Sequence, residues 1–178
     1  MSLRRNSLLV LALASLGAFV ACTGSGPDAP APLEPLPPAT QRLTEHTLLE
    51  CPVESTEATS GALGLLGGTL GLVGAQLEVP LGILALPQRF RIEIPASQFM
   101  EVSISAIGFG HYLFSGPVTV TIDYSRCPDS ALEGGPLTVY HIDEVTKALL
   151  QNMGGVDDRA NRRITFTTDH LSGYAIAN

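Results

Sequence analysis

The sequence contains no tryptophan, few other aromatic residues and few charged ones. Aromatic side chains make up 6% of the 178 residues and charged side chains 15%, whereas 45% are hydrophobic. The 17 acidic residues outnumber the 10 basic ones, which gives a net charge of −7. This balance argues against binding to nucleic acid or to an anionic membrane surface by charge. The hydrophobic fraction is sufficient for one buried core.

Several motifs of known chemistry are also missing. There is no Gly-x-Ser-x-Gly sequence, which excludes the nucleophile elbow of the α/β-hydrolases. No Lys-Ser or Lys-Thr follows the glycine-rich segment 61–74, which excludes a phosphate-binding loop of that type. The histidines lack the spacing of a metal site; they are His46, His111, His141 and His170. We therefore predict no cofactor, no metal and no nucleic-acid partner.

The amino-terminal segment has the parts of a secretory signal. Arg4 and Arg5 precede an apolar run over 8–21, which ends immediately before Cys22. The run is shorter than the ~20 apolar residues that a membrane-spanning helix needs. Its end, Phe19-Val20-Ala21-Cys22, resembles the lipobox of bacterial lipoproteins, although that family usually has Leu at the position of Phe19.

The lipobox resemblance implies that residues 1–21 are removed as a signal peptide and that Cys22 is lipidated, with acyl chains such as palmitate on its sulfur and amino group. The lipid would anchor the protein in the membrane of a bacterial cell envelope. Members of the family with Asp after the cysteine are often retained in the inner membrane. Because Thr23 stands there, we expect the outer membrane if the cell has one. The alternative is an ordinary signal peptide followed by a chance cysteine.

Residues 22–45 are predicted to form a linker. Six of the 13 prolines lie in 23–41, a composition typical of a semi-rigid, extended segment. The remaining sequence, 46–178, is long enough for one domain. Residues 42–50 are ambiguous, with a short helix as one interpretation.

Cys51 and Cys127 predict a disulfide bond within this domain. They are the two cysteines that remain when Cys22 is lipidated. An exported chain enters an oxidising compartment, where such a pair tends to be joined. Two free thiols are the alternative.

Hydrophobic periodicity predicts an all-β domain. Residues 88–94, 100–108 and 118–124 alternate between hydrophobic and polar side chains, which is the period of a half-buried strand. The uncharged segment 61–74 is interpreted as turns and strand edges rather than a membrane segment, because glycine is costly in a helix. Eight or nine short strands with turn residues between them indicate an antiparallel β-sandwich.

Three blocks of this domain resemble the ZU-type domains of zonula-occludens proteins, netrin receptors and ankyrins. The first joins Gly67-Gly68-Thr69 to Leu77–Leu84, the second is Phe114–Ile122 and the third is Thr168–Ala175. The lack of tryptophan and the short segments between the blocks depart from the family pattern. The resemblance spans about residues 66–178 and implies a ZU-like β-sandwich that makes protein contacts and is not an enzyme.

The tripeptide His170-Leu171-Ser172 resembles the site at which some ZU-type domains and adhesion-receptor autoproteolytic domains cut themselves. The resemblance implies that His170 would take the proton of the Ser172 hydroxyl, whose oxygen would attack the Leu171 carbonyl carbon. This reaction needs a strained turn that holds hydroxyl and carbonyl together. The alternative is a turn in which Ser172 only bonds to the backbone.

Two weaker candidates concern cations. His141 and Asp143 lie two residues apart on an expected strand and would share a face, as a metal pair requires. Asp157, Asp158 and Asn161 lie in a glycine-flanked turn, and such oxygen ligands suit calcium, although the spacing of an EF-hand is absent. A solvated strand face and a plain hairpin loop are the respective alternatives.

The expected function is therefore non-catalytic. The sequence indicates a lipid-anchored envelope protein whose β-sandwich binds a protein or has a structural role. One alternative is an autoproteolytic domain that cleaves at Leu171-Ser172. Another is a carbohydrate-binding module, for which Tyr112, Phe114 and Tyr140 are candidate surface aromatics unless they belong to the core.

Overall fold

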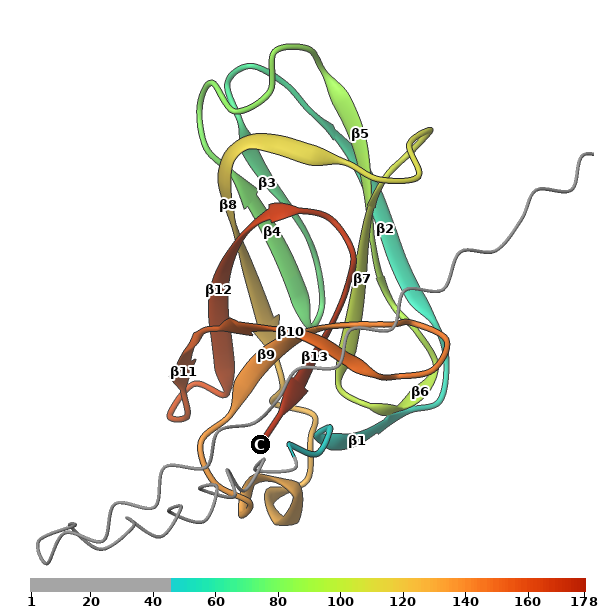
Figure 1. Cartoon of the computed structure of the whole chain (residues 1–178), viewed down its shortest axis with the longest axis vertical. Helices are drawn as coiled ribbons and strands as arrows, with labels where there is room; N and C mark the ends of the chain where they lie inside the picture. The colour runs from blue at the N-terminus through green and yellow to red at the C-terminus, as the bar shows by residue number, and fades with distance from the viewer. Residues whose placement is uncertain (1–45) are drawn as a thin grey trace, which may run out of the picture. The chain divides into compact units, whose positions relative to one another are not determined.

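The computed structural model describes residues 46–178; the predicted signal peptide, Cys22 and the predicted linker lie outside this range. Three antiparallel sheets make up the domain (Figure 1). The six-stranded sheet has the order β10 (Leu149–Gly154), β9 (Thr138–Ile142), β13 (Gly173–Ala177), β7 (Glu101–Ala106), β5 (Gln88–Ile94) and β2 (Glu57–Leu63). The five-stranded sheet has the order β11 (Val156–Asp158), β12 (Arg163–His170), β8 (Leu113–Asp123), β4 (Ala75–Val79) and β3 (Gly68–Leu72). A small sheet pairs β1 (Glu50–Val53) with β6 (Ser97–Phe99).

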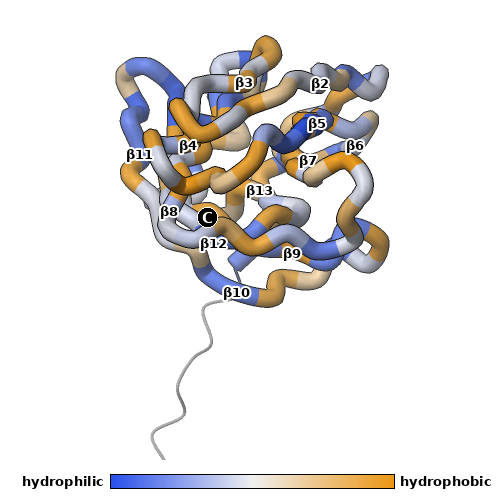
Figure 2. The backbone as a smooth tube through the Cα atoms, turned by 90° about the horizontal axis from the view of Figure 1, so that it is seen from above, coloured by the Kyte–Doolittle hydropathy of each residue, from blue (hydrophilic) through white to orange (hydrophobic). Residues whose placement is uncertain are grey.

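The predicted alternation determines which side chains are buried. On β5, Phe90, Ile92 and Ile94 are fully buried, while Arg89 and Arg91 are exposed. The inward side chains of the two large sheets form one hydrophobic core. Seen from above, the five-stranded sheet lies on one side of the domain and the six-stranded sheet on the other (Figure 2). The predicted all-β class and the antiparallel sandwich are confirmed.

Strand β13 is buried along its whole length, because both of its faces are covered. Tyr174 and Ile176 belong to the main core. Ala175 and Ala177 belong to a second cluster with Tyr140 on the outer face of the six-stranded sheet. A strand covered on both sides is expected to have a continuous run of apolar residues, as β13 does.

Two local interpretations are settled by the structure. Residues 46–50 are extended rather than helical: Leu48 bridges Ala177, and β1 begins at Glu50. The glycine-rich segment 61–74 forms the end of β2 and all of β3, as predicted from its turns. Among residues 46–178, no helix is long and apolar enough to cross a membrane.

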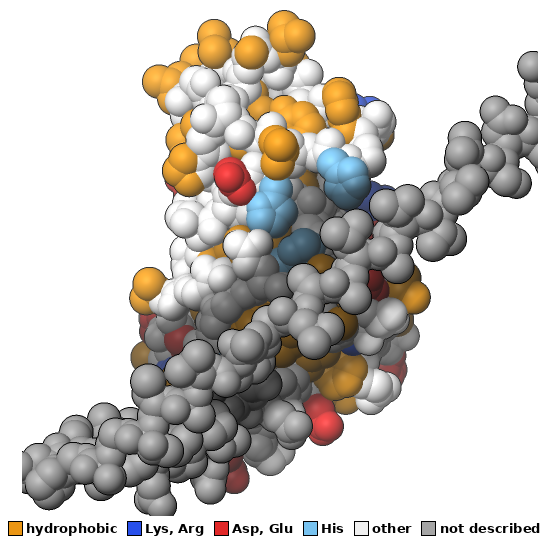
Figure 3. All heavy atoms as spheres, viewed as in Figure 1, with side chains coloured by type: hydrophobic (Ala, Val, Ile, Leu, Met, Phe, Trp, Pro, Cys, Tyr) orange, Lys and Arg blue, Asp and Glu red, His pale blue; other side chains and the backbone are white. Residues whose placement is uncertain are grey.

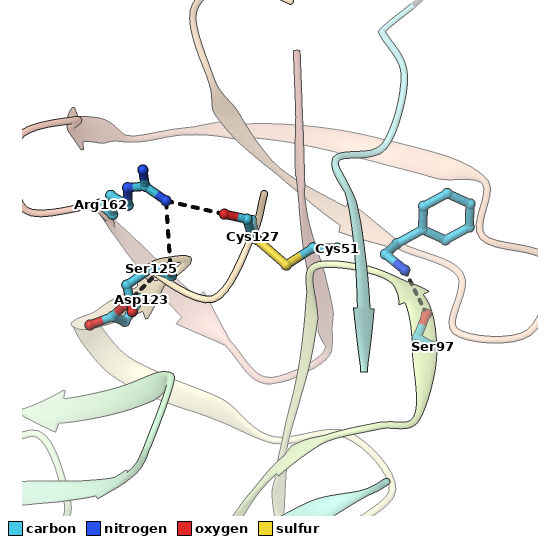
Figure 4. The surroundings of a disulfide bond; sticks show 7 residues. Cys51, Ser97, Asp123, Ser125, Cys127 and Arg162 are labelled. Atoms are coloured by element: carbon cyan, nitrogen blue, oxygen red, sulfur yellow. Dashed lines mark hydrogen bonds between the residues drawn. A yellow bond between two sulfur atoms is a disulfide. The ribbon is translucent and has the colours of Figure 1, made fainter. Parts of the chain in front are cut away.

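The predicted disulfide between Cys51 and Cys127 is present (Figure 4). It connects β1 to the segment after β8, and both cysteines are buried in the main core. The guanidinium of Arg162 donates a hydrogen bond to the carbonyl oxygen of Cys127, at 3.1 Å. The disulfide therefore links the small β1–β6 sheet to the end of the five-stranded sheet.

The domain has two ends, which we call the base and the tip. The base comprises β1, β6, the disulfide and the 3-10 helix η1 (Asp129–Leu132), and the tip comprises loops 64–67, 80–87 and 107–112. Strands β5 and β7 run between them, as Figure 1 shows with the tip uppermost. The first described residues lie at the base, where Thr47 and Asn178 exchange backbone hydrogen bonds.

Candidate functional site

Residues 171 and 172 carry the chain from the five-stranded sheet to the six-stranded sheet. The Leu171 N–H donates to the carbonyl oxygen of Tyr112, next to β8, at 3.2 Å. The carbonyl oxygen of Ser172 accepts from the Ile104 N–H of β7, at 3.0 Å. The Leu171 side chain is buried in the core. The tripeptide singled out in the sequence is thus the crossing point between the two sheets.

The ring of His170 is bonded to its own strand. Its Nδ1 lies 3.0 Å from Oδ1 of Asp169 and 3.3 Å from Oγ1 of Thr168. The carbonyl oxygen of His170 accepts hydrogen bonds from the Tyr174 hydroxyl at 2.5 Å and from Thr168 Oγ1 at 3.0 Å. These donors therefore hold the carbonyl of His170 and not that of Leu171, which self-cleavage would attack.

Ser172 is close to His170 in sequence but is not bonded to its ring. Within residues 46–178, no hydrogen bond joins the Ser172 hydroxyl to His170, and none of residues 170–173 has a positive φ. The strained turn that the autoproteolytic chemistry needs is therefore not a feature of this conformation. Cleavage at Leu171-Ser172 stays a prediction, and the sheet crossing gives the tripeptide a structural role.

His141 on β9 faces His170 across the edge of the sandwich. The two ring centroids lie 5.4 Å apart in an edge-on arrangement. Burial lowers the pKa of His141, and a second positive charge on His170 would lower it further; Glu144 acts in the opposite direction. Among residues 46–178, no group of three His, Cys, Asp or Glu side chains is arranged to hold a metal ion.

Glu144, in the turn after β9, lies across the backbone of β13. Its Oε1 accepts a hydrogen bond from the Ser103 hydroxyl at 2.7 Å. A Cβ atom at Gly173 would lie 2.5 Å from Cγ of Glu144. Gly173 is therefore needed for a close approach and not for a strained turn.

Glu144 contributes to two hollows in the surface. One, of about 250 Å³, is also lined by Ser103, His111 and Ser172. The other, of about 150 Å³, is lined by Glu93, Glu101, Glu144, Lys147 and neighbouring residues, and we call it the glutamate pocket. The sequence offers no signal for this pocket, because its residues come from strands and turns far apart in the chain.

Glu101 is the unusual member of the glutamate pocket. Its side chain is only 3% exposed. Oε2 accepts from the Lys147 ammonium at 2.6 Å, whereas Oε1 is buried and has no hydrogen-bond partner among the described residues. Lys147 has a left-handed backbone, with φ of 61°. A buried carboxylate oxygen without a donor is costly, so a ligand that brings an N–H donor would be favoured there.

The proposed cation sites have structural roles in this conformation. The Asp143 carboxylate accepts from the Val145 and Thr146 N–H groups at 3.0 and 2.7 Å, and these bonds lower its pKa. It therefore closes the β9–β10 turn. A lowered pKa at Asp158 has the same kind of cause, since its carboxylate accepts from the side chain and backbone of Asn161.

Both carboxylate oxygens of Asp157 also have hydrogen-bond partners within the protein. Its two oxygens accept from the Tyr124 hydroxyl at 2.5 Å and the Arg159 guanidinium at 3.0 Å. The segment 154–161 is not one turn as predicted: Asp157 and Asp158 lie on strand β11, and only Asn161 lies in the turn between β11 and β12.

The suggested aromatic platform is wrong, because two of its members are buried in hydrophobic clusters and the third is half-buried against the core. Phe114 and Tyr140 are buried, and Tyr112 packs edge-on against Phe114 with centroids 5.1 Å apart. The alternative interpretation, that these aromatics are core residues, is the correct one. Phe109, which the sequence analysis did not single out, is the exposed aromatic beside them.

Comparison with known proteins identifies no relative of this chain. No protein family matches this chain, and a search of curated proteins finds no similar sequence. The lipoprotein and ZU-type resemblances therefore rest on the sequence motifs described above.

Proposed function

We propose that the chain is a lipoprotein of a bacterial cell envelope, anchored through Cys22, and that its β-sandwich binds a protein partner without catalysing a reaction. The Cys51–Cys127 disulfide supports export, because disulfides persist in oxidising compartments. The basic start, apolar run and lipobox of residues 1–22 supply the signal for that route.

The glutamate pocket is the observation that carries the binding assignment. Its unpartnered Glu101 oxygen and the Glu144 carboxylate attract a positively charged donor. Glu93 is paired with Arg91 at 2.6 Å, and only Lys147 supplies a positive charge among the residues that line the pocket. A lysine or arginine side chain of a partner would meet this requirement. The binding role also agrees with the sheet-crossing geometry at residues 170–173, which leaves His170 bonded to Asp169 and not to Ser172.

The anchor is tested by replacing Cys22 with serine. We expect the wild-type chain to stay with membranes after a carbonate wash and to have the added mass of acyl groups, whereas Cys22→Ser is released. A Ser15→Ala change in the apolar run is the control and should stay with the membranes. Retention of Cys22→Ser in the washed membrane would refute the lipid anchor.

The binding role is tested by capture from envelope extracts with the Cys22→Ser chain as bait. Glu144→Gln should reduce capture of the partner, while Glu133→Gln, at an exposed site outside the pocket, should not. Equal capture by both variants would contradict a role for the pocket. Intact mass of the same bait under denaturing conditions tests self-cleavage, which would release residues 172–178.

A further inference from the structure

The tip of the domain exposes a group of large hydrophobic side chains. Leu65 and Leu66 come from loop 64–67, and Leu81 and Leu86 from loop 80–87; Leu66 is 83% exposed. The backbones of the two loops are joined, since the Gly82 N–H donates to the Leu65 carbonyl oxygen at 2.9 Å. The space-filling view shows hydrophobic side chains gathered over this end (Figure 3).

The neighbouring loop extends the apolar surface. Ile107 and Phe109 are both exposed. Ile107 is fixed to the start of β5, because its N–H donates to the Arg89 carbonyl oxygen at 2.8 Å and its carbonyl accepts from the Gln88 side chain at 3.2 Å. Loops 64–67, 80–87 and 107–112 contain no Asp, Glu, Lys or Arg, although the chain as a whole is acidic. Removing this surface from water therefore buries no carboxylate, ammonium or guanidinium group, and His111 is its one titratable side chain of the Asp, Glu, Lys, Arg and His types.

Several backbone groups of the tip are bonded within the protein. The Gly67 N–H donates to the Gly64 carbonyl at 2.8 Å, and the Ser115 hydroxyl donates to the Ile83 carbonyl at 2.8 Å. Pro80 and Pro87 have no N–H to satisfy. Loops that enter hydrocarbon are costly when their backbone groups lack partners. The bonds within the tip remove part of that cost and fix the backbone that carries its leucines.

The position of the tip suits contact with a membrane. It lies at the opposite end of β5 from the base, where the described chain begins, and a strand of this length spans roughly 20 Å. Residues 22–45 would reach at most roughly 80 Å when fully extended. A chain held at Cys22 is therefore long enough to let the tip turn back to the same bilayer.

We infer that the tip docks on a lipid bilayer, with Leu65, Leu66 and Leu81 entering the boundary between headgroups and acyl chains. Protein-binding hot spots are enriched in Trp, Tyr and Arg and poor in Leu. The exposed hydrophobic side chains of the tip are Leu, Ile and Phe. Since the tip has no Lys or Arg, docking relies on apolar contact and not on anionic lipid. This inference goes beyond the proposed function and does not require lipidation of Cys22.

The test uses the chain from residue 22 onward with Cys22→Ser, so that no acyl group is present. We expect it to sediment with phosphatidylcholine vesicles, with little change between low and high salt. The double variant Leu65→Asp/Leu66→Asp should lower the vesicle partition coefficient roughly tenfold or more, because two apolar side chains are no longer buried. Leu81→Asp should lower it by a smaller factor.

The matched control is Val73→Asp. Val73 is 85% exposed, like Leu66, but lies in the β3–β4 turn near the base. The Val73→Asp variant should bind vesicles as well as the parent, which is the chain from residue 22 onward with Cys22→Ser. Thermal unfolding should show that all variants are folded. An unbound parent, or an equal loss in Val73→Asp, would overturn the inference. So would a parent that forms dimers through the tip, separated by Leu65→Asp/Leu66→Asp, and ignores vesicles. Release of Cys22→Ser from cell membranes tests the anchor separately.

Discussion

The base and the tip of the domain are stabilised by different interactions. The base contains the Cys51–Cys127 disulfide and ion pairs such as Arg162–Asp129 and Arg163–Asp123. The tip contains no disulfide and no ion pair among the described residues, and its loops are joined by backbone hydrogen bonds.

This difference separates two tasks within one sandwich. At the base, the disulfide holds β1 against the segment after β8, and the ion pairs join Arg162 to η1 and β12 to β8. At the tip, glycines shape the loops; Leu84 packs into the core, whereas Leu65, Leu66 and Leu81 face outward. An end built in this way can expose leucines without weakening the core.

The largest effect is expected at the base, on removal of the disulfide. The two cysteines are 76 residues apart in sequence. Closing a loop of that size stabilises a fold by about 4.5 kcal/mol in the chain-entropy treatment. Cys51→Ala/Cys127→Ala should lower the free energy of unfolding by about that amount in urea titrations. An unchanged midpoint would show that the base does not depend on the cross-link.

At the tip, the corresponding change is Gly67→Ala. Gly67 has φ of 68°, and an added Cβ would lie 2.2 Å from the Val79 carbonyl oxygen. Left-handed strain and this clash together should cost about 3 kcal/mol in unfolding free energy.

Gly82→Ala is the control for Gly67→Ala. Gly82 has φ of 81° but nothing within 4 Å of its added Cβ, so it should cost only about 1 kcal/mol. Equal costs for the two glycines would mean that the close approach of loops 64–67 and 80–87 does not hold the tip.

The Glu101–Lys147 pair offers a smaller test, at the base end of β7. Lys147→Met leaves the buried carboxylate without its cation, and we expect a loss of about 2 kcal/mol. Glu101→Leu/Lys147→Met removes both charges and should recover most of that loss. If the double variant is no more stable than Lys147→Met, the buried charge is not the cause.

The strands could be predicted from sequence because their patterns are local. Phe90, Ile92 and Ile94 alternate with polar residues, and that alternation alone places them in the core. Tyr140 shows the limit of this reasoning. Its burial depends on a cluster with Ala175 and Leu48 on the outer face of a sheet, and no local pattern of β9 reports that cover.

The candidate site was less predictable because, like the burial of Tyr140, it depends on contacts between distant segments. Alternation assigns Glu101 to the polar face of β7, but its burial depends on Lys147, in a turn 46 residues further along the chain. The tripeptide at 170–172 was visible as a motif, yet its role depends on which sheets its neighbours join. Contacts between distant segments determine both outcomes, and a single sequence does not record them.

The smallest effect is expected between the two ends, at His141. Burial lowers its pKa below the ordinary value of 6.5, so the folded protein binds this proton less readily than the unfolded chain. The stability contributed by neutral His141 is therefore complete above pH 6.5 and is lost as the pH falls through the lowered pKa. His141→Gln should remove this part of the acid sensitivity, measured as unfolding free energy at pH 7.5 and pH 5.

His170→Gln refines the same measurement. It removes the neighbouring charge that helps to lower the pKa of His141, but it leaves His141 partly buried. The variant should therefore lose less stability on acidification than the wild type and more than His141→Gln. If His170→Gln matched the wild type, His170 would make no contribution to the lowered pKa of His141, and the facing of the two rings would have no energetic consequence.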